Sequence, residues 1–299
     1  MSKRAATKNP AGKGRGAGKA GRAAGAFYLY CVGAESALGP LFEAELPEAI
    51  EETSGLELVT AGGLAAVTSA VPLRDYGEEA LPERLADPAW TAARALRHER
   101  VVHHFARRAA VVPLRFGTIF LARESIGRML GEERDRLRAS LDGIEGHDEW
   151  GLNLYVSRAR LREGVEGVSP RLREMAERAA SLPPGQAYLL RKKIEALRDA
   201  EAREQKKLVV SEVLARLGRL SAAAGRLRTA ANESAEQGEV AAKLYFHVGR
   251  AVFEEFRAEA ERAAEEFLPL GFSFELTGPW PAYNFVRAAG GALPESADD

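Results

Sequence analysis

The chain has 299 residues, of which 46% are hydrophobic and 28% charged, values typical of globular proteins with one to three domains. Its single cysteine, Cys31, excludes an intrachain disulfide and a zinc site built from cysteines. Seven of the 42 cations fall within residues 1–26, which hold no acid, so the formal net charge of −1 conceals a basic leader joined to an acidic body.

Residues 1–26 consist largely of Gly, Ala, Lys and Arg, a composition that predicts a disordered basic tail. The tail contains G-x-G-x-x-G at Gly16–Gly21, but this match precedes the first expected strand, whereas a dinucleotide site follows one. Binding of a polyanion through the tail is an open alternative. The tail has no aromatic residues for base stacking, so nucleic acid is not the favoured partner.

No stretch of the chain approaches the ~20 apolar residues that a membrane-spanning helix needs, so we expect no membrane partner and a cytoplasmic location. The basic leader followed by an apolar stretch has some features of a signal peptide. Its centre, Phe27–Val32, is aromatic and typical of a strand, and it begins the folded part of the chain.

The first half mixes strands and helices. A short helix is predicted over Leu46–Ser54, and Gly62-Gly63 predicts the turn of a β-hairpin. Asp87 and Pro88 predict the start of a longer helix, as N-cap and first-turn residues. One face of that helix carries residues spaced alternately by three and four positions: Ala95, His98, Val102, Phe105 and Ala109.

The segment Val111–Phe120, VVPLRFGTIF, predicts a buried strand, a turn at Gly117 and a second short strand. Arg115 is a cation among apolar residues, so it needs a partner or access to water. The residue can simply extend to solvent from a core turn. Alternatively, Arg115 and His98 line the pocket of an enzyme, although the place of His98 on the apolar row favours a core histidine.

A helix is predicted over Arg123–Leu141, and a domain boundary follows at Gly143–His147. Beyond it we expect a strand, a long helical segment, a strand, a helix and a strand, followed by the block GPWPAYNFV and a flexible tail over residues 289–299. The expected ranges are Trp150–Ser157, Gln186–Leu227, Val240–Val248, Arg250–Phe267 and Phe272–Thr277. This order predicts a modified ferredoxin-like βαβαβ unit with an enlarged helical crossover. The fold class is therefore α+β, with an N-terminal domain over 27–145 and a ferredoxin-like domain over 146–288.

Two blocks, VVPLRFGTIF and GPWPAYNFV, resemble the signature segments of the gas vesicle protein F/L family. FYLYCVG at the first strand, EWGLNLYV at Glu149–Val156 and AYLLRKK at Ala187–Lys193 are also similar to family segments, in the same order. The resemblance covers about Phe27 to Arg287. It implies two α+β domains, one of them a modified ferredoxin-like unit.

The resemblance also implies a non-enzymatic accessory protein of gas vesicle formation, without a catalytic residue, cofactor or metal. Its partners would be the hydrophobic major shell protein and other accessory proteins of the gas vesicle. The candidate family and interaction residues are Pro113, Arg115, Phe116, Gly117, Gly278, Pro279, Trp280, Pro281 and Tyr283.

A partner for such a shell protein must shield apolar surface or an open strand edge before the shell polymerises. We therefore expect contact surfaces on the long helical segment Gln186–Leu227 and near the two signature blocks. A purely structural role for the block residues is the alternative. Gly117 and Gly278 suit tight turns, and Trp280 and Tyr283 suit core packing.

Overall fold

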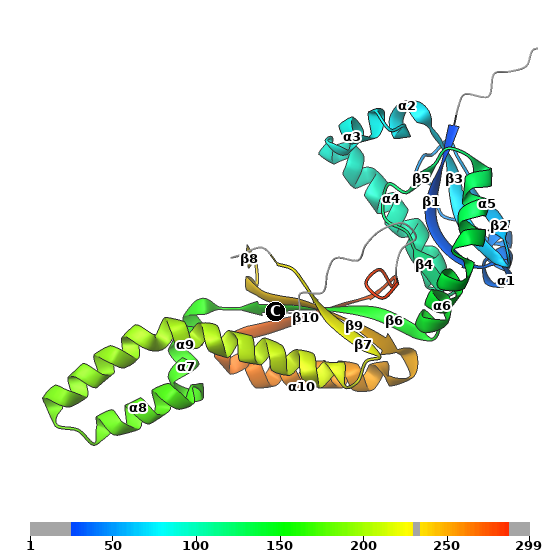
Figure 1. Cartoon of the computed structure of the whole chain (residues 1–299). Coiled ribbons are helices and arrows are strands. Elements are labelled where there is room, and N and C mark those ends of the chain that lie inside the picture. Colours follow the sequence, from blue (N-terminus) through cyan, green and yellow to red (C-terminus); the bar gives the residue numbers. More distant parts are fainter. Residues whose placement is uncertain (1–24, 230–233, 287–299) are drawn as a thin grey trace, which may run out of the picture.

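The computed structural model describes residues 25–229 and 234–286. The chain forms two antiparallel sheets, each covered by helices, arranged one after the other in sequence and in space (Figure 1). The class is therefore mixed helix and sheet, as the sequence predicts. Apart from Gly25 and Ala26, which begin the first strand, the two predicted tails lie outside the described residues.

The N-terminal sheet has the strand order β2-β3-β1-β4, and the short strand β5 also pairs with β1. Its strands are β1 (Gly25–Ala34), β2 (Leu56–Ala61), β3 (Leu64–Pro72), β4 (Val111–Pro113) and β5 (Ile119–Phe120). The hairpin between β2 and β3 turns at Gly62 and Gly63, both with positive φ, as the sequence predicts. The predicted strand pair within VVPLRFGTIF exists, but its two strands do not pair with each other, since both add to β1.

Helices pack on both faces of this sheet, because side chains along β1 alternate between two cores. Tyr28 and Tyr30 lie in one core with α4 (Pro88–Ala106), whereas Leu29 and Val32 lie in the other with α5 (Arg123–Glu132) and α6 (Arg134–Ile144). The Asp87 carboxylate caps α4 by accepting hydrogen bonds from the backbone of Ala89 and Trp90, as predicted. The shorter helices are α1 (Glu35–Leu38), the 3-10 helix η1 (Gly39–Glu43), α2 (Leu73–Tyr76) and α3 (Ala80–Leu85).

Two helix predictions in this half are wrong. Residues 46–54 form no helix, and Ile50 is held instead by a hydrogen bond from its backbone N–H to the Tyr30 hydroxyl. The helix expected over Arg123–Leu141 is two helices, interrupted at Glu133, whose backbone leaves helical geometry with ψ at 9°. Both pieces keep the predicted apolar face, because Ile126, Leu130, Leu137 and Leu141 are buried.

The C-terminal sheet has the strand order β10-β6-β9-β7, with β8 also paired to β9. Its strands are β6 (His147–Val156), β7 (Ala223–Leu227), β8 (Ser234–Ala235), β9 (Gly238–Gly249) and β10 (Phe272–Trp280), all paired antiparallel. Four helices accompany it: α7 (Arg158–Val168), α8 (Pro170–Ala180), α9 (Pro184–Gly218) and α10 (Phe253–Phe267). The 3-10 helices η2 (Arg250–Val252) and η3 (Leu268–Leu270) flank α10.

The long helical segment is shorter than predicted, because α9 ends at Gly218 and Ala223–Leu227 is strand β7. The sequence AAGRL shows no strand alternation, and its strand conformation comes from pairing with β9. Helices α7 and α8 are absent from the predicted order. Each starts at a serine N-cap, Ser157 and Ser169, and the second is followed by Pro170 at its first position.

Helices α7 and α8 pack against the first half of α9 and form a helical arm that projects beyond the sheet (Figure 1). Inside the arm, Leu161, Val165, Leu172 and Ile194 are buried and continue the core of the C-terminal sheet. Within the described residues, no helix combines the length and apolar character that crossing a membrane requires.

Candidate functional site

The structure brings the two signature blocks together, although about 160 residues separate them in sequence. After β10 ends at Trp280, residues 281–286 leave the C-terminal sheet and reach the N-terminal one. Ala282 and Val286 enter the core below α5 and α6, and Tyr283 packs against the core below α4. We call residues 281–286 the clasp, because they contact both halves of the molecule.

A chain of hydrogen bonds links the first block to the clasp. The Gly117 backbone N–H donates to the Tyr28 hydroxyl at 3.0 Å, and this hydroxyl lies 3.0 Å from His98 Nδ1. The opposite ring atom, His98 Nε2, lies 3.2 Å from the Tyr283 hydroxyl, which in turn donates to Glu99 at 3.0 Å. With the imidazole proton on Nε2, the Tyr28 hydroxyl donates to Nδ1 and Nε2 donates to the Tyr283 hydroxyl, so each group in the chain donates to the next.

His98 is held neutral in this network. The residue is 1% exposed, and burial lowers the pKa of its imidazole to about 4, opposed only in part by a hydrogen bond with the backbone of Leu114. Burial also raises the pKa of Tyr28 and of Tyr283, so both phenols stay protonated. The hydrogen-bonded side chains of this network are therefore uncharged as far as Glu99. Burial also raises the pKa of the Glu99 carboxyl.

The clasp contacts the C-terminal sheet through a buried carboxylate. Glu149, on β6, is 4% exposed, and its two oxygens accept from the Asn284 backbone N–H at 2.9 Å and from Asn284 Nδ2 at 2.5 Å. Burial raises the pKa of Glu149, while the bonds from Asn284 oppose the rise. Beside it, the Phe285 ring stacks on His247 with centroids 4.7 Å apart. Polar pairing and ring stacking therefore both fix the clasp on this sheet.

The substitution Asn284→Ala is expected to lower the free energy of unfolding by about 2 kcal/mol at pH 7, because it removes one of two donors to a buried carboxylate. Chemical denaturation measures the loss. In a Glu149→Gln background the same substitution should cost much less, since no buried charge remains. Equal costs in both backgrounds would show that the Asn284 side chain does not stabilise the carboxylate.

The remaining residues of the first block have distinct surroundings. Pro113 is buried on β4 opposite Cys31, and Phe116 packs edge-on to Tyr28 and His98. Arg115 is exposed, so its charge reaches water. Gly117 has φ of +85°, a conformation that favours glycine, at the predicted turn.

The second block is more tightly constrained. Gly278 has φ of +131°, and a Cβ atom there would lie 2.9 Å from the Trp150 ring, so the position requires glycine. A cis peptide bond joins it to Pro279, and Pro281 is buried. Trp280 is 48% exposed and its indole N–H donates to Thr277, so it lies at the surface. Trp280 also lines two small cavities between the halves, of about 170 and 330 Å³.

Neither His98 nor Arg115 lines these two cavities. Neither residue lines the cavity of about 630 Å³ at the base of the arm, or the cavity between α7, α8 and α9 on the arm itself. The described residues contain no cluster of three His, Cys, Asp or Glu side chains that could hold a metal ion. Five partners complete the site and were not predicted as site residues: Tyr28, Glu99, Glu149, Asn284 and Phe285. All but Glu99 lie within the segments that resemble the family. The signals for them were the aromatic strand FYLYCV for Tyr28, and the segments EWGLNLYV and GPWPAYNFV for Glu149, Asn284 and Phe285.

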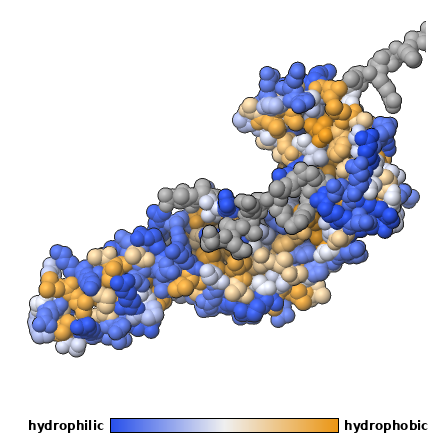
Figure 2. Space-filling model, viewed as in Figure 1, coloured by the Kyte–Doolittle hydropathy of each residue, from blue (hydrophilic) through white to orange (hydrophobic). Residues whose placement is uncertain are grey.

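A second feature lies on the arm, within the segment AYLLRKK. Tyr188 is 65% exposed and Leu189 66% exposed, neighbours on the first turns of α9. Arg191, Lys192 and Lys193 follow, and all three are exposed. Figure 2 shows apolar surface at the far end of the arm among hydrophilic residues. Exposed large apolar side chains grouped in this way are typical of protein-binding surfaces.

The geometry is that of a two-sheet α+β protein whose signature blocks join its halves and whose arm presents apolar side chains. The family model "Gas vesicle synthesis protein GvpL/GvpF" matches residues 26–287, so the chain belongs to the GvpL/GvpF family of gas vesicle proteins. Gas vesicle protein L of Streptomyces sp. (strain CB03234) is 29% identical over 265 residues, covering 83% of this chain and 90% of that protein.

Two solved structures share the fold. The crystal structure of gas vesicle protein GvpF from Anabaena sp. PCC7120 has a TM-score of 0.60 at 13% identity, covering 91% of this chain and all of that chain (100%). The GvpF structure from Microcystis aeruginosa has a TM-score of 0.55 at 15% identity, covering 88% of this chain and 99% of that one. The predicted family is thereby confirmed.

Proposed function

We propose that this protein is a non-enzymatic accessory protein of gas vesicle formation. It binds the hydrophobic major shell protein during assembly, or stays on the shell as a minor component, and it works alongside other accessory proteins. Membership of the gas vesicle family supports the setting. The observation that carries the contact surface is the exposed pair Tyr188 and Leu189 at the projecting end of the arm.

An apolar pair on a projecting helix can enter the groove of a partner, and aromatic residues contribute strongly to such contacts. Ala187, beneath the pair, is 6% exposed and anchors this turn of α9 to the arm. The pair is therefore presented by a packed helix, so little ordering entropy is lost on binding.

The edge strand β7 is a second place at which a shell subunit could add, as a further strand. The strand has five residues, and Arg226 in it is exposed. Short edge strands with a cation resist pairing with other chains. The arm is therefore the better surface for the shell protein.

We propose that residues 27–145 and 146–288 act as two domains and that the second is ferredoxin-like. The order β6, helices, β7, β9, α10, β10 with the sheet order β10-β6-β9-β7 supports the β-α-β-β-α-β form of that fold. The unit differs from the expected βαβαβ by the additional strand β7 and by the two-residue strand β8. The clasp, which belongs to the second range, packs on the first.

The alternative of an enzyme built on Arg115 and His98 has less support. Both ring nitrogens of His98 are engaged by Tyr28 and Tyr283, and the ring is buried, so a substrate would have to displace one of them. The alternative of polyanion binding through residues 1–26 concerns a segment outside the described residues, and the structure adds nothing in its favour.

The double variant Tyr188→Ala/Leu189→Ala is expected to weaken binding to the major shell protein at least tenfold, because truncating buried interface anchors costs on the order of 2 kcal/mol each. Pull-down of purified shell protein, with quantified recovery, measures the effect. The same variant should reduce the number of gas vesicles formed in cells.

Leu208→Ala is the matched control, since Leu208 lies on the same helix and is 53% exposed. It is expected to bind the shell protein like the unaltered chain. Undiminished recovery with the double variant, or the same loss with Leu208→Ala, would remove the arm from the interface.

A further inference from the structure

The exposed apolar pair at the end of the arm has two lysines one helical turn further along α9. Residues four positions apart are neighbours on a helix surface, so Lys192 lies next to Tyr188 and Lys193 next to Leu189. All four side chains are exposed. The rise of an α-helix places the lysines about 6 Å beyond the apolar pair along the helix axis. We call these four residues the tip patch.

The lysines of the tip patch have no counter-charge. Neither Lys192 nor Lys193 forms an ion pair or a side-chain hydrogen bond within the part of the chain that the structure describes. Residues 184–194, the first three turns of α9, contain three cations and no acid. The neighbouring helix α8 carries the exposed acids Glu174 and Glu177, but no ion pair joins either of them to the described cations of α9. The tip patch is therefore cationic as well as apolar.

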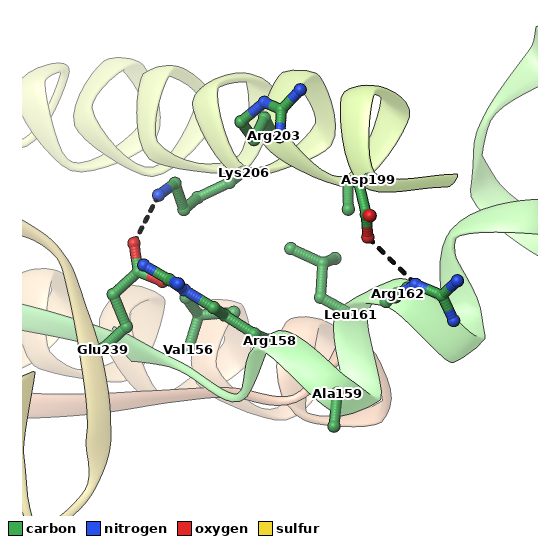
Figure 3. A pocket seen from close by; sticks show the side chains of 10 residues that line it. Val156, Arg158, Ala159, Leu161, Arg162, Asp199, Arg203, Lys206 and Glu239 are labelled. Carbon is green, nitrogen blue, oxygen red and sulfur yellow. Dashed lines mark hydrogen bonds and ion pairs between the residues drawn. The ribbon is translucent and has the colours of Figure 1, made fainter. Parts of the chain in front are cut away.

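Farther along α9, most charged side chains are paired with other elements of the fold. Lys206 Nζ lies 2.7 Å from a Glu239 oxygen, and Arg162 donates to Asp199 at 2.9 Å (Figure 3). Further ion pairs join α9 to its neighbours: Glu195–Arg162, Arg198–Glu166, Glu201–Arg171 and Arg216–Glu259. Charges in the rest of the helix thus connect it to the molecule, whereas the lysines of the tip patch make no such connection.

A partner that covers the apolar pair also comes within reach of the two lysines. Covering an ammonium group with apolar surface removes its water without replacement, which is unfavourable, whereas a carboxylate replaces that water with a charge-assisted hydrogen bond. On the partner, one turn of a helix or two residues of a strand spans about 6 Å, the separation found in the tip patch. The complementary segment therefore has apolar side chains and, displaced by that distance, carboxylates.

We propose that the tip patch binds an amphipathic segment of the major shell protein, in which apolar side chains cover Tyr188 and Leu189 and carboxylates pair with Lys192 and Lys193. The inference rests on the proposed function and adds the chemistry of the partner segment. An anionic membrane also attracts cations beside aromatic and apolar side chains, but helices that lie on membranes present an apolar face along their length. Here the turn after the apolar pair is cationic, which favours a protein segment.

Reversal of the two charges tests the pairing in the full chain. Lys192→Glu/Lys193→Glu is expected to weaken binding of purified shell protein about tenfold at low ionic strength, because attraction is replaced by repulsion. Pull-down over a range of shell protein concentrations measures the affinity. Neither lysine has an ion pair to lose, so the variant should keep its fold, which circular dichroism checks. Lys192→Arg/Lys193→Arg keeps both charges and should bind like the unaltered chain.

The matched control is Arg203→Glu/Lys207→Glu, which makes the same change of net charge at two exposed residues farther along α9 and should leave the affinity unchanged. Salt provides a second readout. At about 1 M salt the Debye length falls to about 3 Å, so the difference between the unaltered chain and Lys192→Glu/Lys193→Glu should shrink. A loss of affinity that the control shares, or a difference that salt does not reduce, would overturn the proposal.

Carbodiimide, which couples amines to carboxylates in direct contact, should link Lys192 or Lys193 to an acidic residue of the shell protein, as mapped by mass spectrometry. The inference is overturned and the proposed function stands if Tyr188→Ala/Leu189→Ala loses binding while Lys192→Glu/Lys193→Glu does not. Both are overturned if neither variant loses binding. If charge reversal weakens binding only to vesicles of phosphatidylcholine and phosphatidylserine, the lysines contact lipid and the inference is likewise overturned.

Discussion

A chain that ends at Pro281 is expected to unfold with a free energy at least about 5 kcal/mol lower than a chain that ends at Val286. The truncation removes Ala282 and Val286 from one core, Tyr283 from the other and Phe285 from its stack on His247. Burial of one large apolar side chain contributes about 2 kcal/mol, and each hydrogen bond about 1. The truncation also removes the two Asn284 donors, so the Glu149 carboxylate stays buried without them.

The chain that ends at Val286 is the matched control, since it keeps every contact described for the clasp. Urea denaturation compares the two, and small-angle X-ray scattering reports whether the halves separate. The chain that ends at Pro281 is expected to have a larger radius of gyration than the chain that ends at Val286. If the two truncated chains have the same stability and the same radius, residues 282–286 do not hold the halves together.

The buried imidazole of His98 is expected to contribute about 3 kcal/mol to the loss of stability between pH 7 and pH 4. Its pKa is lowered from 6.5 to about 4 in the folded protein, so over this interval the unfolded chain binds a proton that the folded chain does not. Stability is therefore complete above pH 6.5 and falls as the pH decreases toward 4. Each unit of pKa difference corresponds to about 1.4 kcal/mol.

The comparison with His98→Gln isolates this contribution, because glutamine does not titrate and the other ionisable groups are common to both proteins. At pH 7 the variant is expected to be less stable, having lost the bonds to Tyr28 and Tyr283. The difference should shrink by about 3 kcal/mol as the pH falls to 4, measured by chemical denaturation at several pH values. A difference that does not change with pH would mean that His98 does not titrate in this interval.

Elements with strong local signals could be predicted from the sequence. The N-cap Asp87 with Pro88, and Gly62-Gly63 between two apolar runs, fix their own backbone geometry, and both predictions are confirmed. The strands β6, β9 and β10 were predicted within three residues of their ends, because their apolar alternation is long. The sequence also carries local start signals for α7 and α8, at Ser157 and at Ser169-Pro170, although neither helix was predicted.

Elements specified by distant partners could not be predicted. The segment AAGRL continues a helical pattern and becomes β7 only because β9 offers its edge. Leu46–Ser54 has a helical start signal at Pro47, but the Tyr30 hydroxyl and the packing of Ile50 on the first core hold it as a loop. In both cases tertiary contacts outweigh local preference.

The candidate site shows the same division. Gly117 was placed correctly as a turn from its own residue type. The meeting of His98 with Tyr283, and of Glu149 with Asn284, joins residues 185 and 135 positions apart, and no spacing within the sequence encodes such pairs. The size of Trp280 suggested a place in a core. The side chain is exposed instead, and this follows from the path of the chain after Gly278.

The most direct measurement of the proposed role is crosslinking of the purified full chain to purified major shell protein with an amine-reactive reagent, followed by mass spectrometry. Lys192 and Lys193 are exposed beside Leu189, whereas Lys207, also exposed, lies about 22 Å further along α9. We expect links to the shell protein from Lys192 and Lys193 in preference to Lys207, and their loss in Tyr188→Ala/Leu189→Ala. An absence of links from Lys192 and Lys193, with the shell protein present in excess, would contradict binding through the arm.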